Sequence, residues 1–213
     1  SKPGRITFVG SGPGDPGLLT TRARAVLATA ALVFTDPDVP EAVLAIVGSE
    51  LPPTSGPAEA AAQDDDGAAA ATPAAATIPG GADIRPALGD PTEVAKLLMH
   101  EARTGVDVVR LVAGDPLSVD SVITEVSALS RTQAQFEIVP GLSPAAAVPT
   151  YAGLPLGSSH TVADVRGDVD WAALAAAPGP LILHATASHL PDAARTLIEY
   201  GLTESTPCVV TAN

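Results

Sequence analysis

The sequence of 213 residues is poor in cysteine, lysine and aromatic residues. A single cysteine, Cys208, excludes an internal disulfide bond and favours a reducing compartment, so we expect a cytoplasmic protein. Aromatic residues make up 3% of the chain and apolar residues 46%, so its core must be built from aliphatic side chains. No apolar run reaches the roughly 18 residues that indicate a membrane-spanning helix. We therefore expect a soluble protein with an aliphatic core.

Positive charge is also scarce in this chain. It has 11 Lys and Arg residues against 24 Asp and Glu, with lysine only at Lys2 and Lys96, and its formal net charge is −13. Because nucleic acids and anionic membranes bind basic patches, we expect neither as a partner. The histidines and the cysteine lack the spacing of metal ligands, and no G-x-S-x-G element is present. The sequence thus predicts no metal site and no hydrolase site of that type.

What the sequence does contain is an alternation of strand-like and helix-like segments. Strands are predicted at residues 5–9, 31–35, 107–112, 136–139, 160–165, 181–184 and 208–211. Helices are predicted at residues 18–29, 40–47, 92–104, 118–130, 143–151, 171–176 and 187–200. This alternation indicates βαβ units, and therefore an α/β fold with mainly parallel sheets.

Two domains and one insertion are expected along the chain. Residues 52–81 are dominated by Ala, Pro, Gly and Asp and have little to bury, which predicts a disordered, low-complexity insertion. We assign residues 1–116 to an N-terminal α/β domain and residues 117–213 to a C-terminal α/β domain. Since the sequence stops directly after the strand-like segment 208–211, we expect the second domain to be truncated.

The most informative segment is residues 9–17, VGSGPGDPG, which follows the first predicted strand. It does not match a nucleotide-binding loop, because its glycines run G-x-G-x-G, Pro13 has no amide to donate and no lysine follows. Other Gly, Pro and Asp segments also follow predicted strands, at residues 36–38, 113–116 and 140–144. Ligands bind beyond the carboxyl ends of the strands in open α/β sheets, so these loops predict a shared ligand crevice.

In this order, the motifs resemble those of the S-adenosylmethionine-dependent tetrapyrrole methylases. The matching segments are residues 9–20 (VGSGPGDPGLLT), 109–116 (VRLVAGDP), 136–141 (FEIVPG) and 151–156 (YAGLPL). The resemblance covers nearly the whole chain apart from the insertion. It implies two α/β domains with a ligand cleft between them, S-adenosyl-L-methionine as cofactor, and C-methylation of uroporphyrinogen III to precorrin-2.

The resemblance also implies roles for individual residues. Asp36 falls on the proton acceptor proposed for the family, a role that suits a carboxylate because a methylated pyrrole carbon must lose a proton. For Asp36 and Asp115 the alternative is a structural role in their turns. The residues implied in cofactor binding are Pro13, Ala113, Gly114, Asp115, Ser118, Ser143, Pro144 and Ala185.

Departures from the family pattern leave a second hypothesis open. Members carry a Gly-Lys-Arg element whose lysine is a proposed proton donor, but no lysine lies between Lys2 and Lys96, and Ala185 replaces a cofactor-lining methionine. Uroporphyrinogen bears eight carboxylates, which are normally bound by Arg and Lys. The alternative to a working enzyme is therefore a catalytically weak, methylase-like binding module. The resemblance further implies a homodimer and, since some bacterial members are fused to it, a uroporphyrinogen-III synthase as partner.

Overall fold

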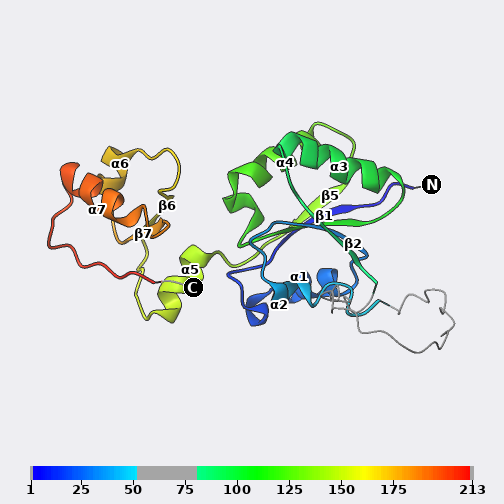
Figure 1. Cartoon of the computed structure of the whole chain (residues 1–213), viewed down its shortest axis with the longest axis horizontal. Helices are drawn as coiled ribbons and strands as arrows, with labels where there is room; N and C mark the ends of the chain where they lie inside the picture. The colour runs from blue at the N-terminus through cyan, green and yellow to red at the C-terminus, as the bar shows by residue number, and fades with distance from the viewer. Residues whose placement is uncertain (1, 52–80, 212–213) are drawn as a thin grey trace, which may run out of the picture. The chain divides into compact units, whose positions relative to one another are not determined.

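The computed structural model describes residues 2–51 and 81–211, which form two compact units (Figure 1). The units comprise Ser1–Leu142 and Ser143–Asn213. Of the insertion expected at residues 52–81, all but Gly81 lies outside the described residues. No helix in the described part of the chain is long and apolar enough to cross a lipid bilayer.

The first unit is built on a parallel sheet of five described strands in the order β3-β2-β4-β1-β5. Their bounds are β1 Ile6–Gly10, β2 Leu32–Thr35, β3 Asp83–Pro86, β4 Val108–Val112 and β5 Phe136–Val139. Strands β1, β2 and β4 are buried along their whole length, as expected for a parallel sheet that is covered on both faces. Because every pairing is parallel, the carboxyl ends of these strands lie at one edge of the sheet.

Helices cover both faces of this sheet, with α1 and α2 on one side and α3 and α4 on the other (Figure 1). The helical elements are η1 Pro16–Leu18, α1 Thr21–Ala28, α2 Glu41–Leu44, α3 Pro91–Arg103, η2 Pro116–Ser118 and α4 Asp120–Ser130. Local sequence explains where they begin: the Thr20 hydroxyl accepts from the Ala23 amide, and Asp90 caps α3 just before Pro91. Two mainly aliphatic clusters fill the space between the helices and the sheet, as the composition predicted.

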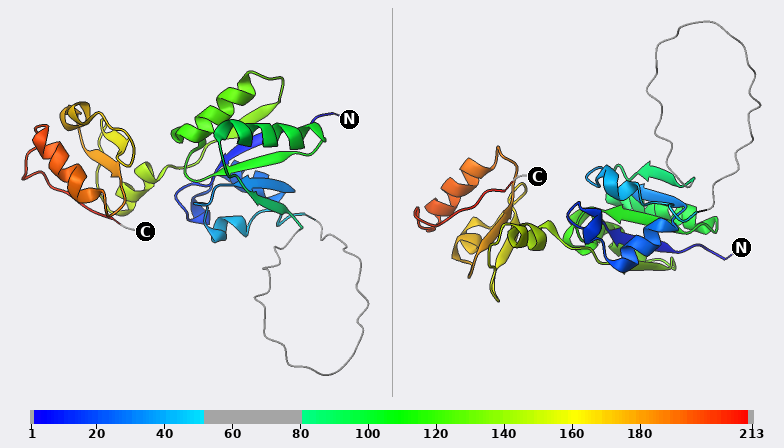
Figure 2. Two further views of the ribbon diagram at one scale, coloured as in Figure 1. Left: turned by 45° about the horizontal axis from the view of Figure 1, so that its top comes forward. Right: turned by 90° about the horizontal axis from the view of Figure 1, so that it is seen from below.

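The second unit is smaller and has a two-stranded parallel sheet (Figure 2). Its elements are α5 Pro144–Tyr151, β6 Thr161–Asp164, α6 Trp171–Ala176, β7 Leu181–His184 and α7 Leu190–Glu199. Both strands are only partly buried, and α6 and α7 pack on each other around Leu174 and Leu197. The mainly parallel α/β organisation expected from the sequence is thus confirmed in both units.

Three details differ from the sequence-based expectation. Strand β3 was not predicted, because Ile84 is its one large aliphatic residue and its pairing with β2 defines it. Residues 208–211 form no strand in the described structure, and Val209 and Val210 are exposed. The boundary between the units follows Leu142 rather than residue 116, because β5 pairs with β1 and α4 packs on α3 within the first unit.

Candidate functional site

The loops that follow β1 and β4 are joined by backbone hydrogen bonds at the carboxyl edge of the sheet. Gly12 and Gly114 exchange two such bonds, with N···O distances of 3.1 Å from the Gly12 amide and 2.9 Å from the Gly114 amide. The Ser11 amide also donates to the Val112 carbonyl over 2.8 Å. Gly12 and Gly114 thus form an antiparallel bridge beyond the parallel pairing of β1 with β4, and this bridge fixes the relative positions of the two loops.

Glycine is required here because the backbones approach closely. A Cβ on Gly141 would lie 2.1 Å from the Gly114 carbonyl oxygen, and a Cβ on Gly10 would lie 2.5 Å from the same atom. Gly12 and Gly114 also have φ values of 71° and 70°, which side-chain-bearing residues rarely adopt. The glycine-rich motifs are thus explained by tight packing of the loops after β1, β4 and β5 against one another.

Asp115 links two of these loops through its side chain. Its Oδ1 accepts a hydrogen bond from the Gly141 amide over 3.1 Å, and its Oδ2 accepts one from the Ser118 hydroxyl over 3.4 Å. A structural role in its turn was the alternative that the sequence left open for Asp115, and these two hydrogen bonds support that role. Asp115 is only partly buried, so its side chain is also accessible to a ligand.

The structure brings five of the eight expected cofactor residues together at this edge. Four of them, Pro13, Ala113, Gly114 and Asp115, are buried or partly buried, and Ser118 is exposed. The other three belong to the second unit, where Ser143 and Pro144 begin α5 and Ala185 follows β7.

The accessible surface of the edge combines apolar side chains with hydrogen-bond acceptors. Leu117 and Leu142, which adjoin the Asp115 and Gly141 loops, are 50% and 39% exposed. Pro13 offers no amide donor, and Asp115 adds a carboxylate. Such a surface fits a ligand with an apolar ring and a positive charge, and it suits S-adenosylmethionine better than a phosphate-bearing nucleotide.

Asp36 lies at the carboxyl end of β2, beside β4. Its amide donates to the Leu111 carbonyl over 3.0 Å, and its Oδ1 is 2.7 Å from Nη2 of Arg110. The Asp36 side chain is 20% exposed, whereas that of Arg110 is 4% exposed. The expected proton acceptor is therefore a carboxylate at the boundary with solvent that is bonded to a buried guanidinium.

Arg110 is in turn held by Glu125, a residue of α4 that is 1% exposed. The contact is bidentate, with 2.8 Å from Nε to Oε1 and 3.1 Å from Nη2 to Oε2. Burial raises the pKa of the Glu125 carboxyl even though Arg110 opposes this shift. Burial alone would lower the pKa of Arg110, but its bonds to Glu125 and the charge of Asp36 keep it above the ordinary value.

The sequence analysis did not single out Arg110 or Glu125. One signal was available for each, since Arg110 interrupts the apolar run VVRLV and Glu125 falls on the buried stripe of α4 between Val122 and Leu129. A charge on the core side of an element needs a buried partner. Which partner it has depends on the packing of α4 against the sheet.

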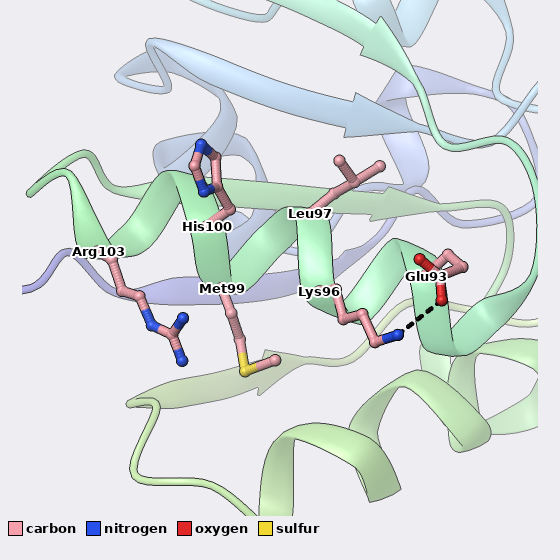
Figure 3. Close-up of a pocket in the computed structure, with 6 residues that line it drawn as sticks. All are labelled: Glu93, Lys96, Leu97, Met99, His100 and Arg103. Carbon is pink, nitrogen blue, oxygen red and sulfur yellow. Dashed lines mark hydrogen bonds and ion pairs between the residues drawn. The ribbon is translucent and has the colours of Figure 1, made fainter.

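A separate hollow lies on the exposed side of α3 (Figure 3). Its lining residues are Glu93, Lys96, Leu97, Met99, His100 and Arg103. Nζ of Lys96 is 2.7 Å from Oε1 of Glu93, so its cation is already paired. Because the lining comes from one helix and includes none of the loops at the strand ends, this hollow is not part of the site.

The fold and the site together define a class of protein: an α/β protein with packed loops beyond the carboxyl ends of a parallel sheet, the position at which open α/β sheets bind ligands. Comparison with known proteins defines the family. Residues 5–213 match the family model of the Tetrapyrrole (Corrin/Porphyrin) Methylases, and the chain belongs to this family.

Individual relatives agree with this assignment. The chain is 31% identical over 217 residues to a siroheme synthase of Nitrosomonas eutropha, covering 97% of the chain and 40% of that protein. It is 30% identical over 219 residues to an S-adenosyl-L-methionine-dependent uroporphyrinogen III methyltransferase of Methanosarcina barkeri, covering 97% of the chain and 76% of that protein. The chain thus spans 40% of the length of this siroheme synthase.

Solved structures give the same fold. The uroporphyrin-III C-methyl transferase of Thermus thermophilus, complexed with S-adenyl homocysteine, matches with a TM-score of 0.68 and 27% identity over 93% of this chain and 77% of its own. A cobalt precorrin-4 methyltransferase matches with a TM-score of 0.68 and 20% identity over 94% of this chain and 76% of its own. The latter likeness concerns the fold alone.

Proposed function

We propose that the chain is an S-adenosylmethionine-dependent C-methyltransferase that acts on uroporphyrinogen III to give precorrin-2. The observation that carries this proposal is the carboxyl edge, where the loops after β1, β4 and β5 are bonded together next to Asp36. The name of the Methanosarcina relative and the ligand of the Thermus structure support the choice of substrate and cofactor.

The loop residues of the edge would hold the cofactor, which supplies a methyl group on a sulfonium. In the first unit these are Pro13, Ala113, Gly114, Asp115 and Ser118; the family resemblance gives the same role to Ser143, Pro144 and Ala185. Their main task is alignment, since methyl transfer is an in-line displacement whose rate depends on how the two reactants are held. The hydrogen bonds between the loops support this role because they limit the movement of the binding surface.

Asp36 would accept the proton that the methylated pyrrole carbon must lose. A positioned carboxylate acting as a general base contributes about 10²- to 10⁴-fold to a rate. The partial exposure of Asp36 supports this role, because a substrate at the edge could reach its carboxylate.

One observation favours the alternative of a catalytically weak binding module. The loop after β3, residues 87–90, has the sequence ALGD and lies at the same edge, but it contains no cation. The resemblance places a Gly-Lys-Arg element between the second predicted strand and the next helix, and a substrate with eight carboxylates would benefit from such cations. Under this alternative the edge binds S-adenosylmethionine or a tetrapyrrole without efficient turnover.

Calorimetry followed by a methyl-transfer assay on the full-length protein separates these functions. We expect S-adenosylmethionine and S-adenosylhomocysteine to bind, and methylated product to form from uroporphyrinogen III. Binding without turnover would contradict the enzyme proposal and support the alternative of a binding module. A failure to bind either compound would contradict both.

The role of Asp36 is tested by Asp36→Asn, with Asp38→Asn as the matched control on the same loop. We expect Asp36→Asn to lower kcat by about 100-fold or more, because the amide cannot accept the proton. Binding of S-adenosylhomocysteine should stay within about twofold of the wild type for both variants, since the loops keep their bonds. Equal turnover by the two variants would show that Asp36 is not the base.

We also propose a homodimer, a cytoplasmic location and a uroporphyrinogen-III synthase domain as a partner. The greater length of the siroheme synthases supports the presence of further domains in such proteins. The single cysteine, which is exposed, supports a reducing compartment. Light scattering of the purified full-length protein tests the dimer directly.

A further inference from the structure

We infer that Arg110 and Glu125 are positioning residues that hold the Asp36 carboxylate for proton transfer. This inference rests on the proposed function and adds to it the group through which Asp36 is oriented. Nη2 of Arg110 is 2.7 Å from Oδ1 of Asp36, while Nε and Nη2 contact the two oxygens of Glu125 at 2.8 Å and 3.1 Å.

Stability alone does not account for this arrangement. Two charges buried against an apolar core lose their hydration, and replacing such a pair with apolar side chains is often neutral or stabilising. Arg110 and Glu125 already satisfy each other through a bidentate contact. Arg110 makes one further bond, to Asp36 in the candidate site. The buried pair therefore has a role in positioning Asp36 in addition to its place in the core.

The charges are also balanced in a way that suits a base. Glu125 cancels the charge of Arg110, so the three side chains carry a formal charge of −1 at neutral pH. Asp36 is then fixed by a hydrogen bond without facing an uncompensated cation that would weaken it as an acceptor. Without Glu125, the full positive charge of Arg110 would act on Asp36.

Arg110 and Glu125 both lie on regular secondary-structure elements that are packed into the first unit. Arg110 lies on β4, which pairs with β1 on one side and β2 on the other, and its Nη1 also donates to the Leu111 carbonyl over 3.1 Å. Glu125 lies in the second turn of α4, between the buried residues Val122 and Leu129. Since Asp36 itself belongs to a loop, its position relative to the sheet is set by this contact and by its own amide.

The inference is tested with the double variant Arg110→Met/Glu125→Leu, which removes the buried pair and leaves Asp36 intact. Apolar replacement should keep the thermal midpoint within about 5 °C of the wild type. We expect kcat to fall by about 100-fold while KM and the Kd of S-adenosylhomocysteine change less than about threefold. Glu101→Gln, which removes the charge from the partly exposed ion pair of Glu101 with Arg85 in the same unit, is the matched control and should behave as the wild type.

Two conservative variants test the same inference if the double variant does not fold. Arg110→Lys retains a charged donor to Asp36 and should restore part of the turnover. Glu125→Gln retains a hydrogen-bonding partner but exposes Asp36 to the charge of Arg110, so its kcat should fall by about 10-fold with little change in KM. Wild-type kcat in Glu125→Gln would overturn the inference.

A spectroscopic readout separates this inference from the proposed function. The ¹³C resonance of the Asp36 carboxyl, assigned by its loss in Asp36→Asn, should shift in the Arg110 and Glu125 variants but not in Glu101→Gln. An unchanged resonance would overturn the positioning role even if the wild type had no methyltransferase activity. Conversely, a wild type without turnover whose resonance shifts as expected would contradict the proposed function alone.

Discussion

The two units of the chain differ in how completely their sheets are covered. In the first unit, β1, β2 and β4 are buried along their whole length, and helices pack on both faces. In the second unit, β6 and β7 are partly exposed and the cluster of buried residues is small. The loops at the strand ends of the first unit are therefore held by a close-packed framework, whereas Ser143, Pro144 and Ala185 belong to a less completely buried unit.

The largest effect is expected where the loops touch, at Gly141. The Cβ of Gly141→Ala would lie 2.1 Å from the Gly114 carbonyl oxygen, a backbone atom that cannot rotate away. We expect a loss of about 4 kcal/mol or more in the free energy of unfolding, together with loss of S-adenosylhomocysteine binding. Gly167→Ala in the second unit meets no atom within 4 Å and should change stability by less than about 0.5 kcal/mol. Similar urea midpoints for the two variants would contradict the close packing of the loops.

A smaller effect is expected from truncation of the first unit's core. Leu98 of α3 is fully buried between the helices and the sheet. Leu98→Ala should cost about 3 to 5 kcal/mol, because a close-packed surrounding cannot collapse into the cavity. Hydrogen exchange of the β1 and β4 amides measures this loss within the first unit.

The same truncation in the second unit should cost less. Leu174 of α6 belongs to a cluster whose other members are largely half-buried, so its surroundings can relax. We expect Leu174→Ala to cost about 1 to 3 kcal/mol. Fluorescence of Trp171, the single tryptophan, reports on this unit because it packs against the same cluster. A cost equal to that of Leu98→Ala would remove the distinction between the two cores.

The smallest effect concerns the surface pair of Asp164 and Arg166. Hydrogen bonds from Arg166 lower the pKa of Asp164 from 3.8 to about 2. A lowered pKa in the folded state means that the ionised carboxylate stabilises the fold above pH 3.8, and that this contribution is lost as the pH falls towards about 2. Because both side chains are about half exposed, solvent screens the pair, and Asp164→Asn should cost at most about 0.5 kcal/mol at pH 7. Urea titrations followed by Trp171 fluorescence should converge for variant and wild type near pH 2; a constant difference would contradict the assignment.

The well-buried part of the fold was predictable from sequence. Apart from Gly10 and Arg110, strands β1, β2 and β4 consist of β-branched and large apolar residues, a composition that indicates buried parallel strands without any tertiary information. Strand β3 could not be found in this way, because three of its residues are Asp, Arg and Pro and it exists by pairing with β2. The segment 208–211 has strand-like residues but no pairing strand in the described structure, so composition alone was misleading there.

The meeting of the loops in the candidate site was predictable from sequence, but the hydrogen bonds and ion pairs within it were not. The glycine and proline motifs identified the edge because they follow strands, a property of local sequence. The contact of Asp36 with Arg110 depends on β2 and β4 being neighbours, and the contact of Arg110 with Glu125 depends on how α4 packs. The spacing of residues along the chain predicts neither the strand order nor the packing of a helix.

The strand order has a consequence for how the chain folds. β1 pairs with β4 and β5, while β2 pairs with β3 and β4, so the first two strands to be synthesised are not neighbours. On a growing chain, β2 and β3 can pair early, but β1 has no neighbouring strand until residues 108–112 have been made. Such distant pairings are slow to form because a long loop must close first. β4 is therefore the strand that joins the β2–β3 pair to β1 in a single sheet. The same pairing places Arg110 beside Asp36.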